Sequence, residues 1–370
     1  MKTKVIAINI ILFLGLYLMS DIFFSRFIFT QSVDHKCYEH TNEGRFYQMK
    51  KNCFANMRLI SSINSFKVYT DIYGRRFSGE KKELGKKNIV FLGDSQTFGV
   101  GSDWNDTFVG MLEKKYKNFN FHNLAVPSYS PTVYNHVLKN FLEKNKTEIE
   151  KIFVLIDLTD VGDEANRWEI INNHPSLKNE KIFYKKKTGF SKFKKENFKG
   201  LYLMASSIRS FFREIDKNND KIVGEYRPVD GNPTGGYIYT DHEILTGCNK
   251  EIQKTQWWSC GGVDYGLKKI QENIIELGSI SSKINSELYI IIIPWPDTLN
   301  FGQKFFNWEN YGNNLCTKSN CAKLINLFPK FNEIKRKHNY WLETLYLNND
   351  IHLTNTGNRM IAEEIKLLAF

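Results

Sequence analysis

The sequence of 370 residues has only one apolar run that could enter a lipid bilayer and no internal repeat. The single run excludes a polytopic membrane protein. With 42% hydrophobic and 25% charged residues, the composition is that of a globular protein, which excludes disordered, collagen-like and coiled-coil classes. The length suits one large domain, or one domain with an insertion.

The apolar run lies at the N-terminus, where Lys2 and Lys4 precede an uncharged stretch over residues 5–19. The stretch is short for a spanning helix, which needs about 20 residues, so a signal peptide and a buried core helix are alternatives. The residues after Leu16 lack the small residues of a cleavage site, which favours an uncleaved transmembrane anchor over residues 1–29. Because the lysines favour a cytoplasmic N-terminus, we expect a membrane-anchored, extracytoplasmic protein.

All six cysteines follow this run and form three pairs that are local in sequence. An even number of cysteines in an exported chain predicts disulfides, although six cysteines allow 15 connectivities. Zinc binding is the alternative, which is disfavoured because the chain has no C-x-x-C pair and no histidine at ligand spacing. The predicted disulfides are Cys37–Cys53, Cys248–Cys260 and Cys316–Cys321.

Residues 30–87 are polar, irregular and basic, which predicts a stalk or linker. From residue 88 to residue 370, apolar strands alternate with amphipathic helices, which predicts an α/β fold with a parallel sheet covered on both faces. The range of about 165–262 breaks the alternation and predicts an insertion. The expected strands are 88–94, 119–125, 152–157 and 288–293, and the expected helices are 108–116, 131–142, 266–284 and 355–368.

The predicted insertion carries much of the positive charge. Residues 178–200 contain nine Lys and two Glu, so this segment has a net charge of 9 − 2 = +7, against 51 − 40 = +11 for the chain. Such a run is usually a solvated face, and the alternative is contact with an acidic glycan or an anionic lipid surface. Binding to nucleic acid is disfavoured because we expect the chain to be exported.

The segment Phe91-Leu-Gly-Asp-Ser-Gln-Thr-Phe-Gly-Val-Gly101 ends the first predicted strand. Gly93 permits a tight turn, so Ser95 would stand at the carboxyl end of the sheet, where α/β folds build their sites. A serine is a weak nucleophile unless a base takes its proton. The alternative is that Asp94 and Ser95 only cap the following helix.

A candidate base lies in the loop before the last predicted helix, where Asp350 and His352 are two residues apart. A carboxylate at this position can hold one ring nitrogen and stabilise the imidazolium, which leaves the other nitrogen to face Ser95. The alternative is that His352 is an ordinary residue at a helix entry. The other seven histidines have no comparable setting.

These two blocks resemble the SGNH/GDSL hydrolase superfamily, and within it the membrane-anchored bacterial members related to polysaccharide O-acetyl esterases and acetyltransferases. The resemblance covers residues 88–369 loosely and the two blocks closely. It implies a three-layer α/β/α domain with a flavodoxin-like sheet, an ester substrate and no cofactor. It also implies a catalytic triad of Ser95, His352 and Asp350.

Two further segments resemble family blocks that supply an oxyanion hole. Residues 123–130 match the second block with Ser128 in place of its glycine, and residues 156–164 match the third block with Thr159 in place of its asparagine. The resemblance therefore implies Ser95, Ser128 and Thr159 as oxyanion donors, with Asn123 or Asn166 as alternatives. Loss of one such donor costs about 10²–10³ in turnover. The acid also lies two residues before the histidine rather than three.

Two other sets of side chains have a functional and a structural interpretation. Asp157, Asp160 and Asp163 could suggest a metal, but acidic residues at a strand end are more often turn and cap groups, so we predict no metal. Trp257, Trp258 and Trp295 would line a sugar-stacking cleft or pack in the core.

The sequence therefore predicts a serine esterase or O-acyltransferase that acts on a cell-surface or secreted glycan. Hydrolysis and transfer share one covalent intermediate, so the sequence does not separate them. The alternative is a non-catalytic, glycan-binding or scaffold protein of a polysaccharide assembly complex, which Thr159 favours. The predicted partners are an acylated glycan, the membrane and polysaccharide assembly proteins, without nucleic acid.

Overall fold

The computed structural model of the chain describes residues 2–27, 37–41, 46–58, 65–79, 85–145, 148–178, 262–303, 306–347 and 350–370. At its centre is a sheet of five parallel strands in the order β11-β10-β7-β5-β6. The chain runs from β5 to one edge and then returns to the other side of β5, so the strand order reverses between β5 and β7. In sheets of this flavodoxin-like order, ligands bind beyond the carboxyl ends of the strands at that point. The strands are β5 (Lys87–Leu92), β6 (Phe119–Asn123), β7 (Ile149–Ile156), β10 (Glu287–Ile292) and β11 (Lys323–Asn326).

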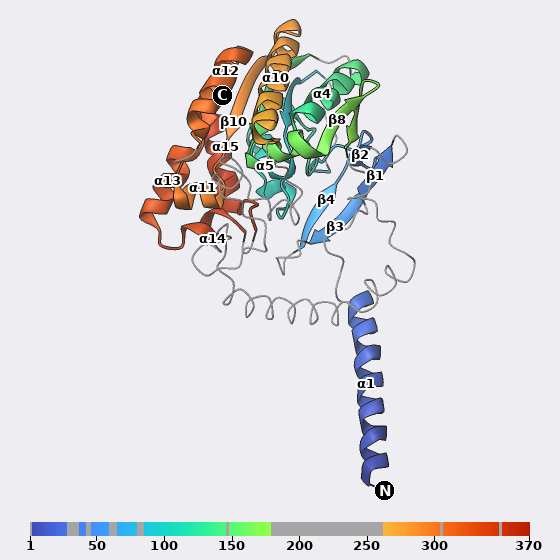
Figure 1. The fold of residues 1–370 in the computed structure, drawn as a ribbon. Coiled ribbons are helices and arrows are strands. Elements are labelled where there is room, and N and C mark those ends of the chain that lie inside the picture. Colours follow the sequence, from blue (N-terminus) through green and yellow to red (C-terminus); the bar gives the residue numbers. More distant parts are fainter. Residues whose placement is uncertain are drawn as a thin grey trace. The chain divides into compact units, whose positions relative to one another are not determined.

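Helices cover both faces of this sheet (Figure 1). Val90, Val154 and Ile290 point to one face and belong to one apolar cluster, whereas Phe91 and Phe153 belong to the cluster on the other face. Because both faces are buried, the strands are nearly continuous apolar runs. These layers confirm the predicted α/β fold. The first face packs against α4 (Pro131–Asn145), α10 (Gly262–Lys283) and α12 (Trp308–Ser319), and the second against α3 (Phe108–Lys115), α13 (Phe328–Lys337), α14 (Trp341–Leu345) and α15 (Asn355–Ala369).

Each strand and helix that the sequence predicts after residue 87 is present, with bounds that shift by a few residues. The segment between β10 and α15 contains elements that the sequence did not predict. Its strand β11 has four residues at an edge of the sheet, and its helix α11 (Pro296–Phe301) has six, so neither repeats its apolar pattern often enough to be recognised.

The region predicted as an irregular stalk contains two β-hairpins. Phe46, Phe66 and Val68 from these hairpins join the apolar cluster on the first face of the sheet. Inward and outward side chains alternate along β4, but four- and five-residue strands give only a weak signal within a polar composition. The hairpins pair β1 (Tyr38–Thr41) with β2 (Phe46–Met49), and β3 (Phe54–Arg58) with β4 (Ser65–Tyr69).

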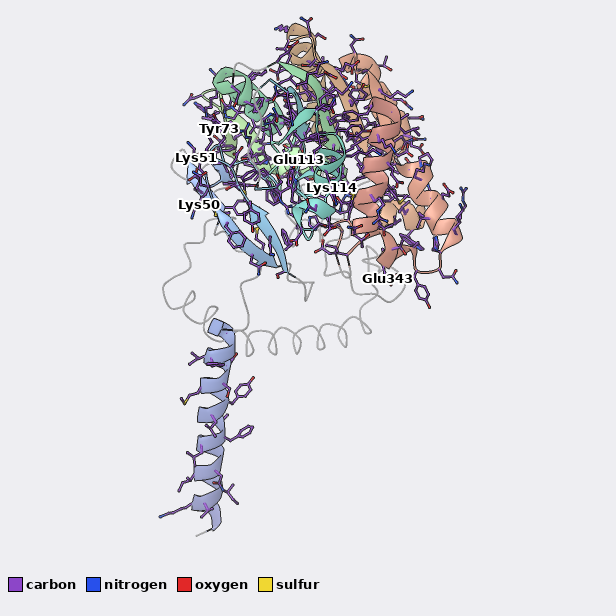
Figure 2. All side chains as sticks on the ribbon, turned by 180° about the vertical axis from the view of Figure 1, so that it is seen from behind. Lys50, Lys51, Tyr73, Glu113, Lys114 and Glu343 are labelled. Atoms are coloured by element: carbon purple, nitrogen blue, oxygen red, sulfur yellow. A yellow bond between two sulfur atoms is a disulfide. The ribbon has the colours of Figure 1, made fainter. Side chains whose placement is uncertain are left out.

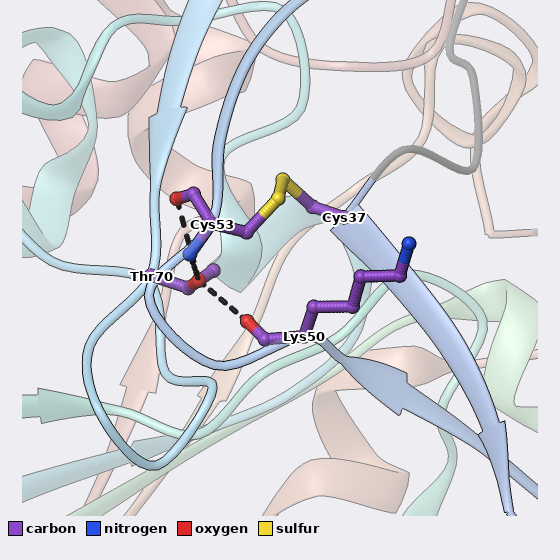
Figure 3. Close-up of a disulfide and its surroundings, with 4 residues drawn as sticks. All are labelled: Cys37, Lys50, Cys53 and Thr70. Atoms are coloured by element: carbon purple, nitrogen blue, oxygen red, sulfur yellow. Dashed lines mark hydrogen bonds between the residues drawn. A yellow bond between two sulfur atoms is a disulfide. The ribbon is translucent and has the colours of Figure 1, made fainter.

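A disulfide joins the two hairpins. Cys37 precedes β1, Cys53 precedes β3, and their bond confirms the predicted pair (Figure 3). The Thr70 hydroxyl donates to the Lys50 carbonyl at 2.6 Å and accepts the Cys53 backbone N–H at 2.8 Å. The disulfide and these hydrogen bonds therefore fix the same turn. Exposed side chains of Lys50, Lys51 and Tyr73 lie close together beside it (Figure 2).

The predicted disulfide Cys316–Cys321 is also present, at the end of α12. The predicted insertion begins with the antiparallel strands β8 (Trp168–Ile171) and β9 (His174–Leu177). Most of its remainder, residues 179–261, lies outside the described residues. The lysine run after Lys178, the pair Cys248–Cys260 and the tryptophans Trp257 and Trp258 lie there as well.

The segment predicted as an N-terminal anchor forms the helix α1 (Lys2–Phe27). Within the described ranges, no helix combines the length and the apolar character that crossing a membrane requires. The anchor over residues 1–29 stays a prediction.

Candidate active site

The first block forms a tight turn directly after β5. Gly93 is required there because a Cβ on this residue would lie 2.1 Å from the Thr97 Oγ1 atom. The Asp94 carboxylate caps the short helix α2 (Ser95–Phe98) by accepting the Gln96 backbone N–H at 2.9 Å. Asp94 is thus the helix cap, and Ser95 is the first helical residue, at the carboxyl end of β5. A backbone N–H in a first helical turn has no acceptor within its helix.

A buried arginine holds the other end of this turn. The guanidinium of Arg76 donates to the carbonyls of Phe98 at 2.5 Å, Gly99 at 2.7 Å and Ser102 at 2.6 Å. Its side chain is only 1% exposed and comes from the segment after β4. The N-terminal hairpins therefore help to fix the loop that carries Ser95. No sequence motif marks Arg76, and our sequence analysis missed it.

The C-terminal block forms a loop in which Asp350 and His352 contact each other. The same Asp350 carboxylate oxygen accepts the His352 backbone N–H at 3.0 Å and the His352 Nδ1–H. The backbone of the loop is closed by the Leu347 N–H, which donates to the His352 carbonyl at 2.7 Å. Asp350 and His352 are two residues apart, which is the separation found in a turn where a carboxylate accepts a nearby backbone N–H. The same carboxylate also contacts the His352 ring.

The first and last blocks meet through the residues next to Ser95 and His352. The Gln96 side-chain amide donates to the Ile351 carbonyl at 3.0 Å, across 255 positions of sequence. The Ser95 hydroxyl donates to Asp94 Oδ2 at 3.2 Å. His352 Nε2 is buried and has no hydrogen-bond partner among the described residues, so no hydrogen bond joins it to Ser95 there.

The third block lies beside the first at the point where the strand order reverses. Asp157 caps the helix α5 (Leu158–Gly162), which follows β7 directly, and its side chain accepts the Thr159 backbone N–H at 2.8 Å. The Thr159 hydroxyl oxygen lies 2.5 Å from Asp157 Oδ1 and 3.2 Å from Asp94 Oδ2. Thr159 is thus close to the Ser95 turn, but its hydroxyl is held between two carboxyl groups.

The second block has the backbone conformation that favours glycine. Ser128 has a φ of 64°, in the left-handed region, which is where the resembled family has its glycine. The Ser128 carbonyl accepts the Trp168 indole N–H at 2.8 Å, and the preceding Pro127 carbonyl accepts the Tyr47 hydroxyl at 3.0 Å. The Tyr129 hydroxyl donates to the Tyr47 carbonyl at 2.7 Å, so the hairpins support this loop too.

Asn123 ties the second block to the first. Its side-chain amide donates to the Thr97 carbonyl at 2.8 Å, its side-chain oxygen accepts the Ala125 N–H, and the residue is fully buried. These bonds position the Ser95 helix and leave the amide engaged, which argues against Asn123 as an oxyanion donor. Asn166 lies in the π-helical segment η4 (Asp163–Arg167) and is half-buried.

Five carboxyl groups are buried around the ends of β5 and β7. Burial, together with the neighbouring Asp94, raises the pKa of Asp157 to about 7. Burial likewise raises the pKa of Asp163 to about 8, although Arg167 at 3.0 Å opposes this rise. Within the described ranges, no group of such side chains has the arrangement of a metal site. The five are Asp94, Asp157, Asp160, Asp163 and Glu164, each no more than 3% exposed.

His352 responds to the same negative charge. Burial lowers its pKa, but the Asp350 carboxylate, with smaller contributions from Asp94 and Asp157, raises the pKa above the ordinary value of histidine. Stabilising the imidazolium in this way makes the neutral ring a better proton acceptor. Trp295 lies near Asp157 and is only 2% exposed, which fits its interpretation as a core residue.

No protein-family model matches the sequence, and no curated protein matches it. Among solved structures, the chain is similar to the acetyl xylan esterase AlAXEase, with 12% identity over 76% of this chain and 100% of that chain, at a TM-score of 0.40. A lipolytic protein of the G-D-S-L family from Veillonella parvula has 11% identity over 76% and 98%, at a TM-score of 0.40. An acetylxylan esterase from Geobacillus stearothermophilus has 8% identity over 78% and 97%, at a TM-score of 0.39. At such identities and TM-scores, the likeness does not decide the reaction of this chain.

Proposed function

We propose that the protein is a serine esterase or O-acyltransferase with Ser95, His352 and Asp350 as its triad. The observation that carries the proposal is the hydrogen bond between Gln96 and Ile351, because these residues directly follow Ser95 and directly precede His352. The contact of Asp350 with His352 Nδ1 supports it, since this contact leaves Nε2 to act as the base. The position of Ser95 at the reversal of strand order supports it as well.

In this mechanism the Ser95 hydroxyl turns from Asp94 to His352 Nε2 and attacks the acyl carbon. His352 takes the hydroxyl proton, and Asp350 stabilises the imidazolium. Backbone N–H groups of Ser95 and Ser128, with the Thr159 hydroxyl, donate to the oxyanion. Collapse of the tetrahedral intermediate breaks the ester bond, and His352 returns the proton to the leaving alcohol. Water or an acceptor hydroxyl then attacks the acyl-enzyme in the same way.

The proposed substrate is an acylated glycan outside the cytoplasm. The disulfides Cys37–Cys53 and Cys316–Cys321 support an extracytoplasmic location, because disulfides persist in oxidising compartments. The basic segment over residues 178–200 supports a substrate with acidic groups.

The test is hydrolysis of a chromogenic acetyl ester by the wild-type protein and by Ser95→Ala. We expect the variant to lose at least about 10³-fold in kcat/KM, since it lacks the nucleophile. Ser279→Ala, which removes an exposed hydroxyl on α10, should retain wild-type activity. Equal product release by wild type and Ser95→Ala would exclude Ser95 as the nucleophile.

A second candidate function is a non-catalytic glycan-binding or scaffold protein of a polysaccharide assembly complex. Two observations favour it: the Ser95 hydroxyl donates to Asp94 rather than to His352, and the Thr159 hydroxyl is held by carboxyl groups. A fluorophosphonate probe separates the two functions. Capture of Ser95 supports the enzyme, and absence of capture in fully oxidised protein supports the binding role.

A further inference from the structure

The Thr159 hydroxyl has two carboxyl neighbours and only one proton. Its oxygen lies 2.5 Å from Asp157 Oδ1 and 3.2 Å from Asp94 Oδ2. A hydroxyl donates one hydrogen bond and can accept two. If both carboxyl groups are ionised, they compete for this proton and none remains for an oxyanion. The arrangement can therefore assist the reaction only if the closer carboxyl group is neutral, in which case the proton leaves the longer contact with Asp94 for the oxyanion.

Asp157 is the one whose surroundings favour the neutral form. It is 1% exposed, and its second oxygen, Oδ2, is buried without a hydrogen-bond partner in the described part of the chain. An ionised oxygen in that position is costly. Asp94, by contrast, accepts hydrogen bonds from the Gln96 backbone N–H and the Ser95 hydroxyl.

The elements packed around Asp157 bring several other carboxyl groups close to it. The first turn contributes Asp94, α5 contributes Asp160, and η4 contributes Asp163 and Glu164. The cations among the described residues are Arg167, which pairs with Asp163, Lys178, which lies beside Glu164, and His352 in its protonated form. Other polar groups also face this cluster. The Tyr134 hydroxyl donates to Asp160, the Ser130 and Thr132 hydroxyls donate to Glu164, and the Trp295 indole N–H lies near Asp157. Burial, and after it the charge of Asp94, raises the pKa of Asp157 to about 7 against the opposing effects of Thr159 and the Trp295 indole.

We propose that Asp157 is a positioning residue that must be protonated for Thr159 to donate its hydroxyl proton to the oxyanion. Neutral Asp157 gives its own proton to the Thr159 oxygen, and that proton stays on Asp157 through the reaction. Ionised Asp157 instead binds the Thr159 proton and removes the donor. The inference rests on the proposed function and assigns a residue outside the triad that switches the oxyanion hole with pH.

The test is the pH dependence of kcat/KM on a chromogenic acetyl ester. In wild-type protein, kcat/KM should rise as His352 loses its proton and then fall by up to about tenfold per pH unit above the pKa of Asp157, towards a level about 10²–10³-fold lower. Asp157→Asn keeps a neutral group at this position, so it should remain active and lose the alkaline decline. Thr159→Val should be about 10²–10³-fold slower at neutral pH and also lack the decline. Asp160→Asn is the comparison variant, because the Asp160 side chain accepts the Asp157 backbone N–H but makes no hydrogen bond to the Thr159 hydroxyl among the described residues. It should retain the decline, shifted to lower pH because a carboxyl group beside Asp157 is removed.

An alkaline decline shared by wild type and Asp157→Asn would overturn the inference while leaving the proposed function intact. Full activity of Ser95→Ala would overturn both.

A second measurement does not need activity. Because the pKa of Asp157 is higher in the folded chain than in the unfolded chain, its contribution to stability is complete below about pH 4 and is lost as pH rises to about 7. The free energy of unfolding of wild type should therefore fall relative to Asp157→Asn over this interval, and identical pH slopes would contradict the inference.

Discussion

The two turns beside the candidate site are held in opposite ways. The Asp350–His352 turn is held mainly by its own residues, because one carboxylate binds both the backbone and the ring of a residue two positions later, and Gln96 adds one distant hydrogen bond. The Ser128 turn depends on residues far away in sequence, since its carbonyls bind Tyr47 and Trp168. A turn of the first kind can be recognised in a sequence and survives changes elsewhere. A turn of the second kind needs the whole N-terminal region to be folded.

The Ser95 loop depends on the N-terminal region in the same way, through Arg76, and the largest effect is expected there. Arg76→Leu removes three donors from buried carbonyls of the Ser95 loop, so we expect the free energy of unfolding to fall by about 3–5 kcal/mol. The neighbouring Arg75 makes a partly buried pair with Asp71, and Arg75→Leu should cost about 1 kcal/mol. Chemical denaturation measures both. Equal losses would mean that Arg76 is no more than another partly buried cation.

Removing either disulfide should have a smaller effect than Arg76→Leu and tests whether the N-terminal hairpins support the Ser128 turn. Cys37–Cys53 closes 16 positions of chain and Cys316–Cys321 closes 5, so their removal should cost about 3 and about 2 kcal/mol respectively. Only the first loss should also lower esterase activity, because Cys37 and Cys53 join the hairpins that support the Ser128 turn. Paired Cys→Ala variants, assayed for unfolding and for kcat/KM, test this. A similar effect of both pairs on kcat/KM would remove the proposed link.

The smallest effect is expected at Ser128 itself. Ser128→Gly relieves a side chain in the left-handed region, so it should stabilise the fold by about 0.5–1 kcal/mol and keep the backbone N–H. We expect kcat/KM to stay within about threefold of wild type, since the proposed donor is the backbone. Ser128→Val, which places a β-branched residue at the same φ, should destabilise instead. A large loss of activity in Ser128→Gly would show that the hydroxyl takes part.

The sequence was sufficient for those features that depend on local patterns. The apolar runs of β5, β7 and β10 predicted the sheet, and the spacing of Asp350 and His352 predicted their contact. The N-terminal hairpins escaped prediction because their strands are short and because their stability comes from packing on the sheet and from one disulfide. Arg76 and Gln96 escaped because their partners are backbone carbonyls, which carry no signature of residue type.

One oxygen atom of the Asp350 carboxylate both closes the loop and orients the His352 ring. A substitution at position 350 therefore changes both at once. Moving that atom to alter the basicity of the imidazole also releases the peptide that shapes the loop, and tightening the loop also changes how the ring is oriented. Substitutions that change the pKa of His352 without disturbing the loop must therefore act through more distant charges, such as the buried carboxyl groups beyond β7, while Asp350 stays unchanged.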